Sequence, residues 1–235
     1  MIMGSTIETT AALLKRLRAE YGFTNYSWKD KSSVLPARPE KLTVQQQDEF
    51  STLIGNIIYN CQLGNDTFRF IAHILGHMNR KVTLEFNAAA AVSMNTTYFD
   101  LWLNPYFMLA LTDDIDEIMA VMEHEIAHIL QRHLVRAKDY LRSSDIEPVN
   151  WATDCSINQL IPKIPSWTIS LKTIEGICGK KLEPNREFEY YLREMLADGK
   201  WRQFKESRKS KACQECSGTG KKQPQSKEYR EGFKE

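Results

Sequence analysis

The segment from Asp114 to Leu134 contains neither glycine nor proline, and acidic residues crowd its first turn. Both features favour one long helix, because acidic side chains interact well with the positive end of the helix dipole. Within it lie His124 and His128, four residues apart, with Glu125 directly after the first. On a helix this spacing puts both imidazoles on one face, one turn apart, while apolar residues fill the opposite arc. The segment is therefore predicted to bury one helix face and to present two histidines on the other.

Two histidines at this spacing beside a glutamate are typical of a zinc-dependent hydrolase. The imidazoles can hold one zinc ion, and Glu125, about 100° further round the helix, reaches a water on the metal instead of the metal itself. The same pattern also arises by chance, so neighbouring segments must supply the rest of the site. A catalytic zinc usually has three protein ligands and one open position, so a third ligand is needed.

His133 is one candidate for the third ligand. It follows His124 by nine residues and projects about 180° away from it on a continuous helix. Since no helix-breaking residue stands between Leu130 and His133, we interpret His133 as a packed or helix-terminal histidine. It could become a ligand only if the helix ended near Leu130.

Asp154 is the other candidate. The segment from Glu147 to Leu160 starts like a helix, with a proline in its first turn. Asn150, Asp154 and Asn158 recur every four residues and form one polar stripe on a largely apolar helix. Such a stripe can be a solvated face or a buried hydrogen-bond network. Beside a zinc pair, Asp154 is the best third ligand, and Asn150 and Asn158 stand where amides could orient it.

With these motifs the chain resembles the putative metallopeptidase domain family, which is often joined to a von Willebrand factor A-like domain. The resemblance runs from about Ala11 to Leu196 and implies a small zincin with ligands at His124, His128 and Asp154. No substrate is implied, and the chain has no room for the von Willebrand module, so no partner role is carried over. Besides the two-histidine motif, the resemblance rests on Leu103-Asn104-Pro105, on Asn150-x-Ala152-x-Asp154-x-x-x-Asn158 and on Glu187-Phe188-Glu189-Tyr190-Tyr191.

Hydrophobic periodicity predicts an α+β fold that is mostly helical: a small zincin-like metallopeptidase fold with a short sheet beside the His124–His128 helix. Helices are expected at 43–63 and 68–78, and strands at 82–86, 88–93 and 98–103. In a zincin an edge strand can pair with an extended peptide substrate, and the strand containing Tyr98, Leu101 and Leu103 is the candidate for this role. The alternative is an ordinary strand of the sheet.

The charge of the chain is unevenly distributed. The net charge is only +1, which disfavours a dedicated nucleic-acid binder. Residues 200–235, however, carry eleven basic and five acidic side chains, so residues 1–199 have a net charge of −5. We therefore predict one metallopeptidase domain over 1–199 and a basic, flexible tail over 200–235, through which alone nucleic acid could be bound.

The tail contains Cys213-x-x-Cys216-x-Gly-x-Gly, which resembles one half-site of the zinc repeats in the DnaJ chaperone family. A closed structural zinc site needs four ligands, so Cys213 and Cys216 would need completion from elsewhere, and a solvated tail without zinc is the alternative. His73 and His77 are also four residues apart, but no acid follows His73, and we interpret them as structural or surface histidines.

The five cysteines are an odd, scattered set, which suits a reducing compartment. No apolar stretch reaches the length of a signal peptide or membrane span. A cytoplasmic location and no membrane partner are therefore expected.

These features predict a zinc-dependent peptidase in which Glu125 acts as the general base toward a water activated by Zn²⁺. The alternative, from another class, is a non-catalytic zincin-like binding protein whose basic tail engages an acidic protein or nucleic acid. Glu125 favours the enzyme, because a purely structural zinc site has no use for a base. The expected partner is a peptide or protein substrate. Whether the chain forms a homo-oligomer stays an open question.

Overall fold

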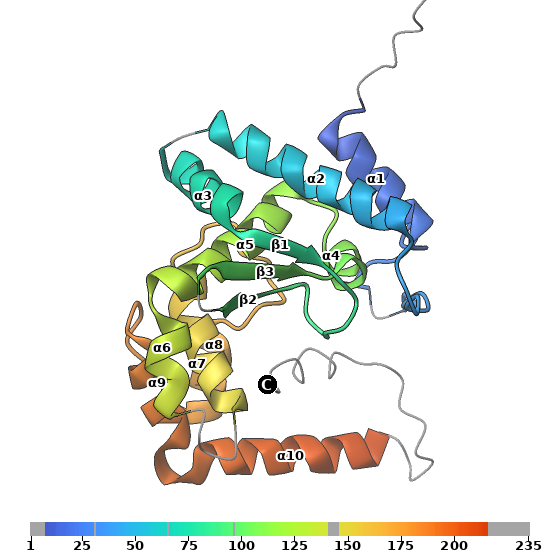
Figure 1. Cartoon of the computed structure of the whole chain (residues 1–235). Coiled ribbons are helices and arrows are strands. Elements are labelled where there is room, and N and C mark those ends of the chain that lie inside the picture. Colours follow the sequence, from blue (N-terminus) through green and yellow to red (C-terminus); the bar gives the residue numbers. More distant parts are fainter. Residues whose placement is uncertain (1–7, 31, 65, 96, 141–145, 216–235) are drawn as a thin grey trace, which may run out of the picture. The chain divides into compact units, whose positions relative to one another are not determined.

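The computed structural model describes residues 8–30, 32–64, 66–95, 97–140 and 146–215, the last seven of them by their main chain only. Two compact units divide the chain, and the boundary falls between Ile126 and Ala127, inside one helix. The described elements are mostly helices with one small sheet (Figure 1), which confirms the predicted α+β class. Within these residues, no helix combines the length and the apolar character needed to cross a bilayer.

Unit 1 starts with α1 (Thr10–Glu20), α2 (Val44–Gln62) and α3 (Asp66–His77). A capping box begins α2: Thr43 Oγ1 accepts from the main-chain N–H of Gln46, and the Gln46 side chain accepts from the Thr43 N–H. The predicted helix over 43–63 is therefore confirmed to within one residue at each end. Five of the apolar positions that predicted it are buried, and Cys61 is half-buried; the five are Phe50, Leu53, Ile54, Ile57 and Ile58.

The sheet has three strands in the order β1-β3-β2, formed by β1 (Asn79–Val82), β2 (Ala90–Met94) and β3 (Phe99–Leu103). β1 pairs parallel with β3, and β2 pairs antiparallel with it (Figure 1). The central place of β3 contradicts the prediction that Tyr98, Leu101 and Leu103 form an edge strand for substrate. Both sides of β3 are already hydrogen-bonded, and the Leu101 and Leu103 side chains are fully buried.

The first strand also differs from the prediction, because it spans 79–82 and not 82–86. Its position follows from a buried acid on β3. Asp100 accepts hydrogen bonds from Lys81 Nζ at 2.9 Å and Asn79 Nδ2 at 2.8 Å, and both partners lie on β1. These bonds lower the pKa of Asp100 and fix β1 alongside β3. Hydrophobic periodicity gives no sign of such a polar contact between distant segments.

Asn104 turns the chain from β3 into the helices that lead to the histidines. Its Oδ1 accepts from the main-chain N–H groups of Tyr106 and Phe107, while Pro105 occupies the first turn of α4 (Pro105–Leu111). The next helix, α5 (Ile115–Leu130), begins after Asp114, whose Oδ1 accepts from the Asp116 N–H at 2.8 Å. The Asn-Pro pair is therefore a helix start that follows the sheet directly.

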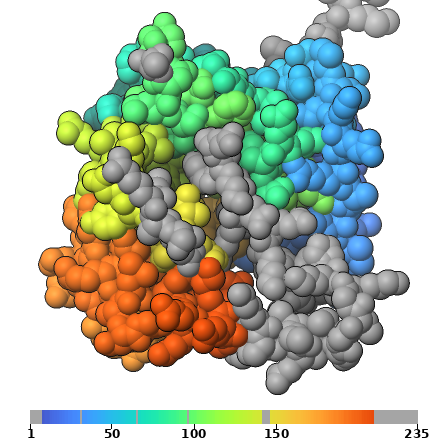
Figure 2. Space-filling view, turned by 60° about the horizontal axis from the view of Figure 1, so that its bottom comes forward, coloured from blue at the N-terminus to red at the C-terminus, as the bar shows by residue number. Residues whose placement is uncertain are grey.

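Unit 2 consists of short helices around one core. After α5 come α6 (His133–Arg136), the 3₁₀ turn η1 (Ala137–Asp139), α7 (Glu147–Asn158), α8 (Leu171–Cys178), α9 (Phe188–Leu196), the turn η2 (Ala197–Gly199) and α10 (Lys200–Glu215). In Figure 2 the orange surface of α9 and α10 is continuous, as expected of helices that share a core. The largest buried members of this core are Trp151, Phe188, Tyr191, Met195 and Trp201.

The beginning of α10 belongs to this core and not to a solvated tail. Trp201 is only 4% exposed, and its ring meets Trp151 of α7 edge-on, with centroids 5.2 Å apart. Phe204, one turn further along α10, contacts both rings. Packing thus continues past the boundary at Lys200 that the charge distribution predicted. The rest of the predicted tail, from residue 216, lies outside the described residues.

We expect Trp201→Ala to lower the free energy of unfolding by about 3–5 kcal/mol, since it removes a large buried ring from the core. Urea unfolding followed by circular dichroism measures the change. Leu160→Ala is the control, because Leu160 is 56% exposed and its truncation leaves the core intact. A loss for Trp201→Ala no larger than for Leu160→Ala would mean that α10 does not stabilise unit 2.

Candidate metal centre

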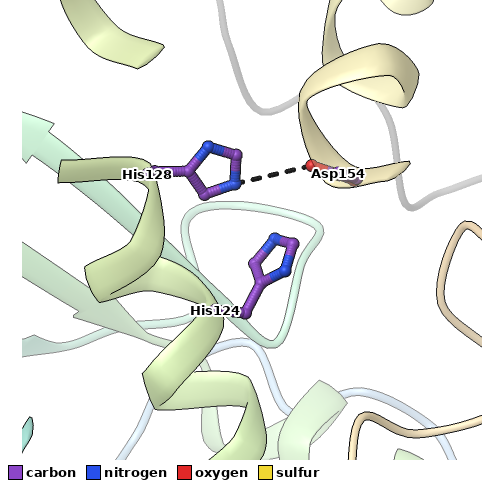
Figure 3. Close-up of side chains that lie close together, drawn as sticks. All are labelled: His124, His128 and Asp154. Atoms are coloured by element: carbon purple, nitrogen blue, oxygen red, sulfur yellow. Dashed lines mark ion pairs between the residues drawn. The ribbon is translucent and has the colours of Figure 1, made fainter. Parts of the chain in front are cut away.

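Helix α5 carries both histidines of the motif. His124 and His128 lie one turn apart on the same continuous helix, so the helix itself fixes their relative position. His128 falls in the last turn, and its side chain is 15% exposed. The prediction that these two imidazoles share one face is supported by the view in Figure 3.

Helix α5 ends at Leu130, earlier than predicted. Arg132 has a left-handed backbone, with φ of 56° and ψ of 32°, and α6 starts at His133. The predicted helix up to Leu134 is therefore wrong. A left-handed residue at a helix end is usually glycine or asparagine, so an arginine in this place gives no sign of the break in the sequence.

The break changes the surroundings of His133. Its side chain is 2% exposed, so it is packed as expected, but it does not continue the apolar face of α5. Its Nδ1 lies 3.2 Å from Nδ1 of His128, a hydrogen-bonding distance that sequence reasoning did not find. On one helix these two residues would point about 140° apart, so the break at Arg132 is what brings them together.

Helix α7 supplies the carboxylate. Asp154 Oδ1 lies 3.5 Å from Nε2 of His128 (Figure 3), and both residues belong to unit 2. His124, His128 and Asp154 each offer one ligand atom, and these three atoms lie within 4.8 Å of one another. Among the described residues this is the group of histidine, cysteine and acidic side chains that could hold a metal ion. His133 is not part of it.

The donor set fits a transition-metal ion. Two imidazoles and one carboxylate form a ligand set found at catalytic zinc, which keeps a fourth position for water or substrate. All three side chains are partly exposed, as a centre that admits substrate requires. The sequence thus predicted three residues that the structure brings together, although they come from two helices.

Cys155, the neighbour of Asp154, does not add a ligand. Its side chain is fully buried in the core of unit 2, and this burial, with a smaller contribution from the charge of Asp154, raises the pKa of the thiol to about 12. A thiol with this pKa stays protonated near neutral pH and is a poor nucleophile, and Cys155 is not among the residues whose ligand atoms lie together.

The two asparagines of the polar stripe differ in their contacts. Asn158 is buried, and its Nδ2 donates to the main-chain oxygen of Ile169 at 2.8 Å, which ties the end of α7 to the segment before α8. Asn150 is half-buried, and its main-chain oxygen accepts from Thr153 Oγ1 at 2.9 Å. Their predicted role in orienting Asp154 stays a prediction.

Glu125 lies one residue after His124 and is 8% exposed. It therefore sits on the buried part of α5, next to the histidine face, where its role as a base stays a prediction.

The other candidate metal residues lie elsewhere. His73 and His77 are exposed on α3, and His77 Nδ1 contacts the His73 main-chain oxygen at 2.8 Å. The Cys213 side chain and all of Cys216 lie outside the described residues. The zinc half-site predicted for them stays a prediction.

Comparison with known families agrees with the cluster. A family model described as "Putative metallopeptidase domain" matches residues 70–233, a span that contains His124, Glu125, His128 and Asp154. The match begins and ends later than the sequence resemblance, which ran from about Ala11 to Leu196. The chain matches no curated protein and no solved structure. Since the family model covers most of the chain and all of the cluster, the chain belongs to this metallopeptidase domain family.

Proposed function

We propose that the protein is a zinc-dependent peptidase in which His124, His128 and Asp154 hold the metal and Glu125 is the general base. The observation that carries the proposal is the cluster of three ligand atoms within 4.8 Å, built from two helices in a metallopeptidase domain. Family membership supports the class of reaction. The choice of zinc and the role of each residue are the finer parts of the proposal.

The ligand types favour zinc over harder cations. Magnesium and calcium prefer oxygen ligands, whereas two imidazoles and one carboxylate suit zinc and neighbouring transition metals. The end of α5 adds a favourable field. His128 lies in its last turn, where the partial negative charge of the helix dipole stabilises a cation by about 0.3–1 kcal/mol.

The chemistry divides between the ion and the chain. A divalent cation at this cluster would polarise the scissile carbonyl and make a nearby water more acidic. Glu125 takes a proton from that water as its oxygen attacks the carbonyl carbon. Glu125 then passes the proton to the amide nitrogen as the peptide C–N bond breaks, so that an acid and an amine leave. Glu125 directly follows His124 on α5, so metal binding by His124 and His128 places Glu125 beside the reacting atoms.

We expect Glu125→Gln to retain about one zinc per chain and to slow peptide cleavage by about 10²–10⁴-fold, because the amide cannot accept the proton. Zinc content is measured by atomic absorption. Cleavage is measured as the rate at which an unfolded protein substrate is cut. Glu123→Gln is a matched control on the same helix, directly before His124, and should leave cleavage unchanged. Full cleavage by Glu125→Gln at normal zinc content would disprove the role of Glu125.

We expect Asp154→Ala to weaken zinc binding by more than about 100-fold, since it removes a ligand instead of a group that orients one. Competition with a chelator measures the affinity. Asp139→Ala, which removes an acid from η1 of the same unit, is the control. Equal losses for both variants would contradict ligation by Asp154.

The same measurements distinguish the peptidase from the alternative, a non-catalytic binding protein. A wild-type chain that holds zinc at all three residues yet cleaves no peptide would favour a non-catalytic protein. Binding of a hydroxamate, which needs a vacant metal position, would then show whether the centre is still open.

A further inference from the structure

His128 presents its two ring nitrogens to different partners. Nε2 faces Asp154 Oδ1 at 3.5 Å, and Nδ1 faces Nδ1 of His133 at 3.2 Å. The His128 and His133 rings meet edge-on, with centroids 5.2 Å apart. At this distance one Nδ1 donates a hydrogen and the other accepts it, so the tautomer of one ring determines the tautomer of the other.

His133 is held firmly in this place. Its ring meets Phe188 of α9 edge-on at 5.2 Å, and both side chains are almost fully buried. Arg136, on the same short helix as His133, places its guanidinium over the ring of Phe188, 5.2 Å from the ring centroid. The ring of His133 therefore has little freedom to turn away from His128.

Arg136 also joins α6 to the helices on either side of it. Its Nη1 donates to the main-chain oxygen of Gln131, just after the end of α5. Its Nε and Nη2 donate to both carboxylate oxygens of Glu189, and Nη2 also reaches Glu187 at 2.8 Å. Figure 1 shows α6 beside α9, as these bonds require. The break at Arg132 is thus held by bonds to the end of α5 and to the start of α9.

We propose that His133 is a positioning residue for the metal centre: it accepts a hydrogen bond from Nδ1 of His128 and so leaves the Nε2 lone pair of His128 directed at the metal. The inference rests on the proposed function only in that His128 is a ligand. A histidine that binds metal through Nε2 carries its hydrogen on Nδ1, and an acceptor there fixes both the tautomer and the ring orientation. In most metal sites this acceptor is a carboxylate or a main-chain oxygen, whereas at this centre it is a second imidazole.

The test compares His133→Asn with His133→Leu. The two side chains have the same branching and nearly the same size, and both lose the ring contact with Phe188. Only asparagine keeps an acceptor, because its Oδ1 occupies the place of the histidine Nδ1. Zinc affinity of the metal-free protein is measured by chelator competition, and thermal unfolding of the metal-free protein is measured alongside.

The two readouts are expected to rank the variants in opposite orders. His133→Leu should bind zinc about 10- to 100-fold more weakly than wild type, whereas His133→Asn should keep most of the affinity. Leucine should nevertheless be the more stable metal-free variant, because a buried amide costs more than a buried hydrocarbon. A merely structural role for His133 predicts that zinc affinity follows stability. His77→Phe, a change on the exposed face of α3, is the control and should alter neither readout.

Equal zinc affinity for the two variants, or tighter binding by His133→Leu, would overturn the inference while leaving the proposed peptidase intact. Conversely, the expected ranking in a protein that cleaves no peptide would uphold the role of His133 and count against the peptidase. Failure of the wild-type chain to bind zinc would overturn both.

Discussion

Helix α5 ends within one turn of His128, and the candidate centre depends on that ending. The left-handed backbone at Arg132 costs energy in a residue other than glycine, so the surroundings must offset it. Arg136 does so by binding a main-chain oxygen beyond the end of α5 and two glutamates at the start of α9. The break stops the helix where its negative end lies beside the candidate ligands, and a second imidazole is buried against His128. A longer α5 would lose both features.

The carboxylate of the cluster depends on a different constraint, the core of unit 2. Helix α7 buries Trp151, Ala152 and Cys155 in that core, and Trp201 of α10 covers Trp151 from the side. With this face fixed, the remaining face of α7 carries Asp154 toward Nε2 of His128. Hydrophobic packing therefore sets the position of Asp154, and the polar stripe is the face of α7 that does not pack into the core. This arrangement also explains why a basic segment that reads as a tail begins as part of the core.

Local signals predicted the elements that local interactions form. The apolar positions of α2 predicted its limits to within one residue, and Pro148 marked the first turn of α7. Strands expected at 88–93 and 98–103 are found at 90–94 and 99–103, as β2 and β3. Prediction was wrong where distant segments decide. Asp100 places β1 at 79–82 and, with it, moves β3 to the centre of the sheet, so the supposed substrate strand has no free edge.

The sequence by itself determined that His124 and His128 share one helix face with Glu125 beside them, because the pitch of a helix converts spacing into direction. It also identified Asp154, although only by the repeat of polar residues every four positions. The tertiary structure decided that Asp154 reaches His128 and that His133 does so from the other side of the ring. The physical reason is that both contacts join His128 to residues beyond the end of α5. Helical spacing predicts side-chain directions only within one helix, whereas burial against α9 and the ion pairs of Arg136 fix the position of the chain after α5.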